Sequence, residues 1–310
     1  MSQSVSQSIA PARLRPGDTV AIVAPASPVP GERLRAGLAA AGDRYRLRLP
    51  DDIDRATGYL AGSDQRRAEE LNRALRDPDV RAVWLARGGY GILRLLPLLD
   101  ADALRADPKP IIGFSDATAL LGWALAAAGV RGIHGPVVVQ LGALPPEDAA
   151  WLFALLEGRA EGPLATGLEP VGAPARGRVE GPIIGGNLIL LGHLVRTAAF
   201  PSLAGALLLI EEVDEKPYSI DRCLTSIELC GALDRVAGAL VGDFTACVDP
   251  KYPAPDAHQV ADERLRAFAL AGLRGAPIGH GARNRAVPFG GRCALDLDRG
   301  TAELLEPAVG

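Results

Sequence analysis

The sequence is poor in the residues that build metal centres and disulfide frameworks. Its 310 residues include only four cysteines and four histidines. No C-x-x-C pair occurs, and Cys223 and Cys230, seven residues apart, are expected to pack as small apolar residues of one helix. The histidines form no H-E-x-x-H or similar metal signature. We therefore expect no metal, no cofactor and no disulfide framework.

Long apolar runs and an excess of basic residues are also absent. No segment approaches the roughly 18 uncharged apolar residues that span a membrane, and the N-terminus lacks the basic segment and apolar run of a secretory signal. The 33 basic and 37 acidic side chains give a net charge of -4, whereas nucleic-acid binders usually have a basic excess. These absences predict a cytoplasmic protein that binds neither a membrane nor nucleic acid.

What the chain has in quantity is apolar sequence in alternating strand-like and helix-like segments. Hydrophobic residues make up 48% of the chain, enough for a substantial core. In the first part, buried strands are expected at 19–24, 80–86 and 110–114, and helices at 63–76 and 116–128. Strands that alternate with helices are typical of a parallel sheet with helices on both faces.

The second part of the chain repeats this alternation after a segment of different composition. Residues 146–180 are rich in proline, glycine and glutamate and are interpreted as a connector with one short helix near 149–156. We then expect a Gly185-Gly186-Asn187 turn before a helix, and a short C-terminal strand pair. The predicted fold class is α/β, with an N-terminal doubly wound parallel-sheet domain (1–145) and a smaller C-terminal α/β domain with a mixed sheet (181–310).

The first candidate for chemistry lies where the third predicted strand meets the following helix. Gly113, Ser115 and Ala117 approximate the G-x-S-x-G turn, which lifts a serine hydroxyl above the sheet edge, beside free N–H groups of the helix. Ala117 replaces the last glycine of that motif. On this motif alone, a helix N-cap at Ser115 or Asp116 is the simpler interpretation.

A glycine-rich segment follows the second predicted strand. Arg87-Gly88-Gly89-Tyr90-Gly91 has three glycines in four positions, which allows positive φ angles and a close approach of the backbone to a ligand. The segment could complete an oxyanion hole or hold a phosphate, although it has neither the Gly-Lys-Ser/Thr ending of a P-loop nor the G-x-G-x-x-G fingerprint. A plain tight turn is an equally good interpretation.

Candidate acidic and basic groups come later in the chain. The apolar segment 207–210 ends in Glu211 and Glu212, which strand alternation sends to opposite faces, although both could also be solvated. His280 lies between two glycines, and imidazole suits general acid–base work near neutral pH, although a surface histidine would look the same. Ser115, a glutamate and His280 follow the chain order of α/β-hydrolases, which alone is not diagnostic.

Seven blocks of sequence, spread over nearly the whole chain, add a further observation. They read LRPGD and VAIVAPASP within 14–28, GYLAGSDQRRAEELNRALRDPDVRAVWLARGGYG at 58–91, IIGFSDATALL at 111–121, HGPVV at 134–138, GGNLILL at 185–191, IEEVDEKPYSIDRCL at 210–224 and GHGARNRAVPFG at 279–290. In register, these blocks resemble the LD-carboxypeptidase family, which includes muramoyltetrapeptide carboxypeptidases and microcin-immunity peptidases. One departure is Glu212, where the family often has aspartate.

The resemblance implies a two-domain fold, a homodimer, and a site between the domains with a Ser-Glu-His triad. Carried over by position, Ser115 is the nucleophile, His280 is the base, and Glu211 is the acid that orients the base. The glutamate doublet leaves Glu212 as the other candidate for the acid.

The resemblance also implies groups that bind the substrate. The oxyanion donors would be the backbone N–H groups of Asp116 and of Gly88 or Gly89. A carboxypeptidase needs a counter-charge for the terminal carboxylate of its substrate, and Arg87 is the candidate because a guanidinium pairs well with carboxylates. A structural salt bridge would explain Arg87 equally well. Asn187 is a second candidate for substrate binding.

The implied function is that of a serine LD-carboxypeptidase. It would remove the C-terminal D-alanine from murein tetrapeptides through an acyl-enzyme during cell-wall recycling. One alternative is hydrolysis of an aminoacyl-adenylate-like, microcin-type antibiotic, for which such enzymes tend to have an aromatic-bearing loop; here Trp151 and Phe153 have a spacing that favours core packing. A second alternative is a non-enzymatic, two-lobed ligand-binding protein, which the match of serine, glutamate and histidine to family positions disfavours.

Overall fold

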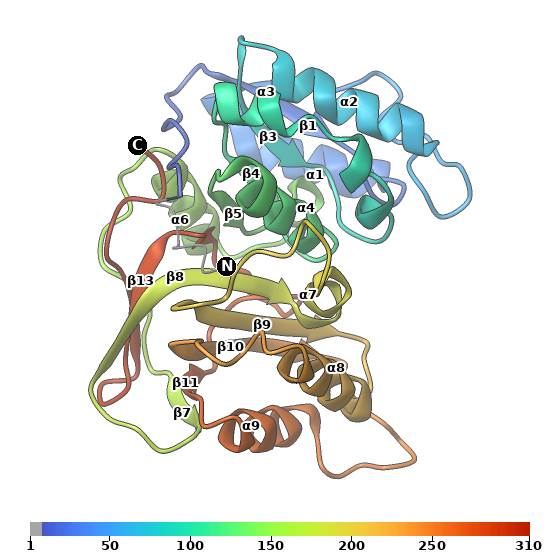
Figure 1. The fold of residues 1–310 in the computed structure, drawn as a ribbon. Coiled ribbons are helices and arrows are strands. Elements are labelled where there is room, and N and C mark those ends of the chain that lie inside the picture. Colours follow the sequence, from blue (N-terminus) through green and yellow to red (C-terminus); the bar gives the residue numbers. More distant parts are fainter. Residues whose placement is uncertain (1–7) are drawn as a thin grey trace.

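The computed structural model describes residues 8–310, and the first half of the chain forms a parallel sheet (Figure 1). The strands lie in the order β2-β1-β3-β4-β5, and each neighbouring pair is parallel. These strands are β1 (Thr19–Val23), β2 (Arg46–Arg48), β3 (Val80–Leu85), β4 (Ile111–Gly113) and β5 (Gly132–His134). The helices of this half are α1 (Gly31–Ala41), α2 (Asp64–Arg76), α3 (Ala101–Ala106), α4 (Ala117–Trp123) and α5 (Val138–Leu141). The βαβ arrangement expected from the sequence is confirmed.

Local signals in the sequence set the ends of two of these helices. The Ser63 side chain accepts a hydrogen bond from the backbone N–H of Arg66 (3.2 Å) and so caps α2. Helix α4 continues into a π-helical turn, Ala124–Ala128, and ends at Gly129, whose φ of 72° a glycine adopts without strain. Short 3₁₀ turns occur at Gly42–Arg44, Ile92–Arg94 and Leu96–Leu98.

The second half of the chain builds another set of parallel strands beside the first. Its parallel strands are β8 (Arg178–Asn187), β9 (Leu207–Val213), β10 (Gly238–Thr245) and β11 (Ala271–Arg274). The helices that connect them are α7 (Leu188–Leu194), α8 (Pro217–Leu229) and α9 (Ala257–Ala267). Strand β9 begins with four apolar residues, and nearly all of its residues are buried. Such a strand is expected in a parallel sheet that is covered on both faces.

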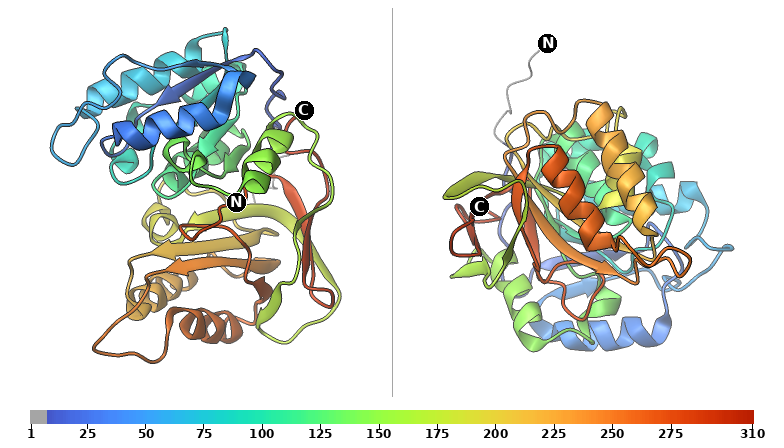
Figure 2. Two further views of the ribbon diagram at one scale, coloured as in Figure 1. Left: turned by 180° about the vertical axis from the view of Figure 1, so that it is seen from behind. Right: turned by 90° about the horizontal axis from the view of Figure 1, so that it is seen from below.

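The two halves share one sheet. Strand β12 (Val287–Phe289) pairs antiparallel with β5 and parallel with β8, which gives the order β2-β1-β3-β4-β5-β12-β8-β9-β10-β11-β7. Strands β13 (Arg292–Asp296) and β14 (Thr301–Leu304) form the expected C-terminal pair, and β13 also pairs with β8. Figure 2 shows both halves from behind and from below. Strand β12 therefore carries hydrogen bonding from one half into the other.

Residues 146–180 differ from the expected connector. They contain α6 (Pro146–Leu156), where one helix was predicted, but also β6 (Pro163–Ala165) and β7 (Glu169–Gly172). Strand β7 pairs antiparallel with β11 at the edge of the sheet, and β6 pairs with β14. The prediction of a Gly185-Gly186-Asn187 turn is also wrong. These residues end β8 and pair with β9, because glycine allows the φ angles of 137° and 138° found there.

The described residues contain neither disulfides nor candidate membrane spans. All four cysteines are free, and Cys223, Cys247 and Cys293 are buried. None of the helices within residues 8–310 combines the length and the apolar character that a bilayer crossing requires.

Candidate active site

The three residues of the expected triad lie at one edge of the sheet. Ser115 lies two residues after β4, Glu211 lies near the end of β9, and His280 lies in the loop after β11. In a parallel sheet, the carboxyl ends of the strands meet at the same edge, where α/β enzymes place their sites. The topology therefore gathers residues that are up to 165 positions apart in the sequence.

The backbone at Ser115 adopts an unusual conformation. Its φ is 63°, in the left-handed region that few residues other than glycine adopt, and its side chain stays partly exposed. The neighbourhood is crowded, since a Cβ added to Gly113 would lie 2.9 Å from the Cβ of Ala117. A strained turn of this kind between strand and helix characterises the nucleophile elbow of α/β-hydrolases.

The glycine-rich segment 87–91 lies directly against Ser115. A Cβ added to Gly88 would lie 3.0 Å from the Cβ of Ser115 and 3.2 Å from its Oγ. Gly89 has a φ of 115°, which only glycine adopts readily. Within residues 8–310, the backbone N–H groups of Gly88, Gly89 and Asp116 donate no hydrogen bond to the protein. These N–H groups are therefore available to an oxygen placed beside the Ser115 hydroxyl.

Glu211 and His280 form a close pair. Glu211 Oε2 lies 2.8 Å from His280 Nδ1, and the Glu211 side chain is fully buried. A Cβ added to Gly279 would lie 2.9 Å from the same Oε2, so a larger residue at this position would displace the carboxylate. A carboxylate at this place accepts a hydrogen bond from Nδ1–H, which leaves Nε2 of the imidazole free to take a proton from another group.

Phe114 places the imidazole near the serine. The rings of Phe114 and His280 have centroids 4.6 Å apart, and Phe114 immediately precedes Ser115. Among the described residues, no hydrogen bond joins the Ser115 hydroxyl to His280. Catalytic hydrogen bonds of unliganded hydrolases are often long and shorten only when substrate binds. The structure thus brings the three residues into one cluster, in which the Glu211–His280 contact is direct.

The second glutamate belongs to a different set of contacts. Glu212 Oε1 accepts hydrogen bonds from Asn187 Nδ2 (2.5 Å) and from the backbone N–H of Val213 (2.9 Å), and Oε2 accepts from the N–H of Ile189 (2.9 Å). Burial raises the pKa of Glu212 to about 7, although these donors lower it in part. The expectation that Glu211 and Glu212 face opposite sides is confirmed, and both are buried rather than solvated.

The two expected substrate contacts also have partners within the protein. Arg87 Nη1 donates to the backbone oxygen of Pro28 (2.6 Å), so the salt bridge considered for this residue is not its observed contact. Asn187 Oδ1 caps α7 by accepting from the N–H of Leu190 (3.1 Å), while its Nδ2 holds Glu212. These contacts give Asn187 an internal role, and its substrate-binding role stays a prediction.

The loop that carries His280 is fastened by side chains from α6, a contribution that we did not predict. Arg283 donates to both carboxylate oxygens of the fully buried Asp148 (2.9 and 2.5 Å). Trp151 Nε1 donates to the backbone oxygen of Ala286 (2.8 Å). The partners are 135 positions apart, so no local pattern in the sequence could have revealed this fastening.

A buried histidine adds to the surroundings of His280. His134, at the end of β5, is fully buried, and neither ring nitrogen has a hydrogen-bond partner among the described residues. Burial, with a smaller contribution from His280, lowers the pKa of His134 to about 3. His134 is therefore neutral near neutral pH and adds no charge next to the cluster of Ser115, Glu211 and His280.

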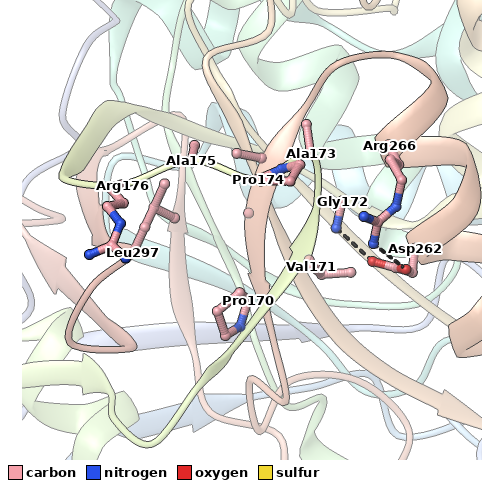
Figure 3. A pocket seen from close by; sticks show the side chains of 12 residues that line it. Pro170, Val171, Gly172, Ala173, Pro174, Ala175, Arg176, Asp262, Arg266 and Leu297 are labelled. Carbon is pink, nitrogen blue, oxygen red and sulfur yellow. Dashed lines mark hydrogen bonds and ion pairs between the residues drawn. The ribbon is translucent and has the colours of Figure 1, made fainter.

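Other candidates for a site include a metal cluster and a cavity beside α9. Residues 8–310 contain no group of three or more His, Cys, Asp or Glu side chains that could hold a metal. A cavity of about 520 Å³ lies between β7 and α9 (Figure 3). There the Asp262 carboxylate accepts from the N–H of Gly172 (2.8 Å) and from Arg266 (2.9 Å), so its charge is already paired. No member of the expected triad lines this cavity.

Comparisons with known families cover both halves of the chain. The family model described as the LD-carboxypeptidase N-terminal domain matches residues 20–135. The model described as the LD-carboxypeptidase C-terminal domain matches residues 180–295.

Relatives of known name match over most of their length. The murein tetrapeptide carboxypeptidase of Pseudomonas aeruginosa is 37% identical over 295 residues, which cover 90% of this chain and 94% of the relative. The probable murein peptide carboxypeptidase of Bacillus subtilis is 34% identical over 297 residues, or 94% and 93% of the two chains. The microcin C7 self-immunity protein MccF of Escherichia coli is 27% identical over 280 residues, 80% of each chain.

Solved structures show the same fold. The muramoyltetrapeptide carboxypeptidase from Oxalobacter formigenes superposes with a TM-score of 0.77 at 26% identity, covering 92% of this chain and 97% of the other. Wild-type MccF without ligand gives a TM-score of 0.87 at 24% identity, covering 97% and 100%. The predicted fold class, α/β with a parallel sheet and a second α/β part, is confirmed.

Proposed function

The chain belongs to the LD-carboxypeptidase family and is a serine carboxypeptidase, and we propose that it removes the C-terminal D-alanine from murein tetrapeptides through an acyl-enzyme. The observation that carries the proposal is the Glu211–His280 pair beside the strained turn at Ser115. The relatives named for murein peptides supply the substrate class. Removal of this residue fits a role in cell-wall recycling.

The first half of the proposed reaction forms the acyl-enzyme. Ser115 Oγ attacks the carbonyl carbon of the last peptide bond while His280 Nε2 takes the hydroxyl proton. Glu211 holds the imidazole in the tautomer with Nδ1 protonated and offsets its positive charge. The carbon–nitrogen bond then breaks, His280 returns the proton to the nitrogen of the departing D-alanine, and the peptide remains as an ester on Ser115.

The second half hydrolyses that ester. Water attacks the ester carbonyl, and His280 takes one of its protons and passes it to Ser115 Oγ as the ester bond breaks. In both halves, negative charge develops on the carbonyl oxygen, next to the N–H groups of Asp116 and of Gly88 or Gly89. An oxyanion donor of this kind typically contributes about 3–4 kcal/mol to transition-state stabilisation.

The substrate's terminal carboxylate needs a positive partner. Arg87 immediately precedes Gly88 and Gly89, whose N–H groups would bind the oxyanion, and one of its nitrogens donates to the backbone oxygen of Pro28. A guanidinium has five N–H donors, so Arg87 keeps donors for a carboxylate. We propose Arg87 for this role.

The alternative substrate is an aminoacyl-adenylate-like antibiotic, as the similarity to a microcin self-immunity protein suggests. A nucleobase would stack on an exposed aromatic ring, and within residues 146–180 neither aromatic side chain of α6 supplies one. Trp151 is buried, and the guanidinium of Arg285 lies 3.9 Å above its ring. Phe153 is buried between Tyr45 and Trp84. The rings of α6 are therefore not available to a nucleobase, and the higher identity to the relatives named for murein peptides favours the murein peptide.

The deciding measurement is kcat/KM on four compounds: a murein tetrapeptide, its C-terminal amide, its all-L isomer and an aminoacyl-sulfamoyl adenylate. We expect the tetrapeptide to be cleaved fastest. The amide should be cleaved about 30-fold more slowly or worse, because a partly buried cation left unpaired costs about 2–5 kcal/mol. Faster turnover of the adenylate would refute the proposal in favour of antibiotic hydrolysis. Equal rates on the acid and the amide would refute the carboxylate site alone.

Two further parts of the proposal come from the family resemblance. We propose that the protein is a homodimer and acts in the cytoplasm, where peptides from cell-wall turnover would reach it. Light scattering on the purified protein tests the first statement, and fractionation of cells tests the second.

A further inference from the structure

The exposure of two tyrosines at the glycine-rich segment 87–91, here called the oxyanion segment, has no structural explanation. Tyr90 belongs to this segment and Tyr59 lies beside it. Tyr59 and Tyr90 expose 66% and 50% of their surface, while their rings meet edge to face with centroids 5.6 Å apart. Large aromatic side chains are usually buried, and an exposed pair leaves considerable apolar area in water. A contiguous exposed apolar feature of this kind is typical of a binding surface.

The pair lies at the nucleophile. Tyr90 is two residues after Gly88, which touches Ser115, and its backbone N–H donates to Ser27 Oγ (3.1 Å). Consecutive Cα atoms are about 3.8 Å apart, so the Cα of Tyr90 lies within about 8 Å of that of Gly88. The backbone that carries Tyr90 is therefore close to the N–H groups of Gly88 and Gly89 that would hold the substrate carbonyl.

Both tyrosines are presented on fixed backbone. Tyr59 lies at the tip of a two-residue turn closed by hydrogen bonds between Thr57 and Leu60 (2.8 and 3.2 Å). This turn packs against the oxyanion segment, since a Cβ added to Gly91 would lie 2.6 Å from the Leu60 side chain. A site held in its binding conformation loses little entropy when it is occupied.

The charge beside the rings indicates which chemistry they accept. Arg94 is held by Asp64, through Nε (2.9 Å) and Nη2 (2.7 Å). Asp64 thus offsets the charge of Arg94, four residues after Tyr90, and the exposed ring faces offer apolar area to methylene groups.

We infer that Tyr59 and Tyr90 bind the aliphatic stem of the residue on the acyl side of the scissile bond, which in the proposed substrate is the diamino acid. This inference rests on the proposed function. It assigns the pair a part in specificity, because the acyl-side residue supplies the carbonyl that Gly88 and Gly89 would hold.

The test uses three tetrapeptides that differ only in the third residue: lysine, norleucine or alanine. For the wild-type protein, we expect kcat/KM to be similar for lysine and norleucine and about ten-fold lower for alanine. In the double variant Tyr59→Ala/Tyr90→Ala, the KM for the lysine peptide should rise about ten-fold or more with kcat nearly unchanged. The preference for lysine over alanine should then disappear. Phe variants at both positions should retain the preference, because they keep the rings.

Two controls separate binding from folding. Leu229→Ala removes an equally exposed apolar side chain from the end of α8, at the opposite edge of the sheet, and should leave the kinetics unchanged. Labelling of Ser115 by a small fluorophosphonate should proceed at the wild-type rate in the double variant.

Each remaining outcome decides between the two proposals. Retention of the lysine preference in the double variant would overturn the inference, as would a norleucine peptide cleaved far more slowly than the lysine peptide. A wild-type protein that cleaves none of the three peptides would refute the proposed function, and the inference with it.

Discussion

The two sides of the site are held in place by different means. The serine side is set by backbone geometry, with positive φ at Ser115 and Gly89 and little room for a side chain at Gly88. The histidine side is set by side chains, with Glu211 on the ring and Asp148 on the loop. A larger residue at Gly88 would therefore act by steric clash with Ser115. A substitution of Glu211 or Asp148 would instead remove a hydrogen-bond partner and leave His280 or its loop less constrained.

The largest effect should come from removing the reacting groups themselves. Ser115→Ala and His280→Ala should each lower kcat by about 10⁴–10⁶-fold with the fold intact, as for members of a catalytic triad. Steady-state kinetics on the tetrapeptide, with circular dichroism as the control for folding, measure this. Turnover near the wild-type rate in Ser115→Ala would remove the nucleophile assignment.

The two adjacent glutamates give the sharpest contrast on the histidine side. Glu211→Gln should lower kcat by about 10²–10⁴-fold, because an amide no longer fixes the imidazole tautomer or offsets its charge. Glu212→Gln, which alters contacts to Asn187 and Ile189 instead, should change kcat by less than about ten-fold. The reverse ranking in the same assay would transfer the role of the acid to Glu212.

On the serine side, Gly88→Ala tests steric exclusion. The new methyl group would lie 3.0 Å from the Cβ of Ser115, so either the serine or the oxyanion segment must shift. We expect kcat to fall about 10–100-fold with little change in stability, since a small displacement of reacting groups is enough for such a loss. An unchanged kcat would show that the segment 87–91 does not constrain the nucleophile.

Asp148→Asn tests the fastening of the histidine loop. The substitution weakens the pairing with Arg283 and leaves the loop less constrained, so we expect a loss of about ten-fold in kcat with KM nearly unchanged. Because the loop carries His280, the pH profile of kcat should also shift. A variant with lower stability but the wild-type pH profile would assign Asp148 to folding alone.

The smallest effect concerns the pH dependence of stability. The pKa of Glu212 is about 7 in the folded protein, above its ordinary value of 4.5. Its folded form therefore binds the proton more tightly, and the resulting stabilisation is complete below about pH 4.5 and lost as the pH rises through about 7. Urea unfolding at pH 5 and pH 8 measures the free energy of unfolding of the wild type and of Glu212→Gln. The wild type should exceed the variant by less at pH 8 than at pH 5. An advantage that grows with pH would contradict this assignment.

The sequence was most informative where structure is determined locally. Strand β4 and the turn at Ser115 follow from an apolar run next to glycine and a helix start, and the strand alternation at Glu211 and Glu212 separates them as expected. Strands β6 and β7 could not be predicted from their proline- and glycine-rich sequence, because backbone pairing with β14 and β11 defines them.

The candidate site also combines features that are determined locally with features that depend on distant residues. The residues that we propose as catalytic stand in recognisable motifs, but the contacts that hold them do not. The spacing of Trp151 favoured core packing, but the partners of Trp151 and of Asp148 lie 135 positions away. The exposure of Tyr59 and Tyr90 likewise depends on the packing of two loops that the sequence does not bring together.

The shared sheet has a mechanical consequence. Strand β12 is bonded to β5 on one side and to β8 on the other, and the hydrogen bonds Ile183 N–H to Gly291 O (2.9 Å) and Gly290 N–H to Ile183 O (2.7 Å) continue that join. A rotation that opened one half away from the other would have to break these hydrogen bonds. Substrate entry and product release are therefore expected to depend on surface loops, so Ser115 from one half and Glu211 and His280 from the other are expected to keep their spacing through each turnover.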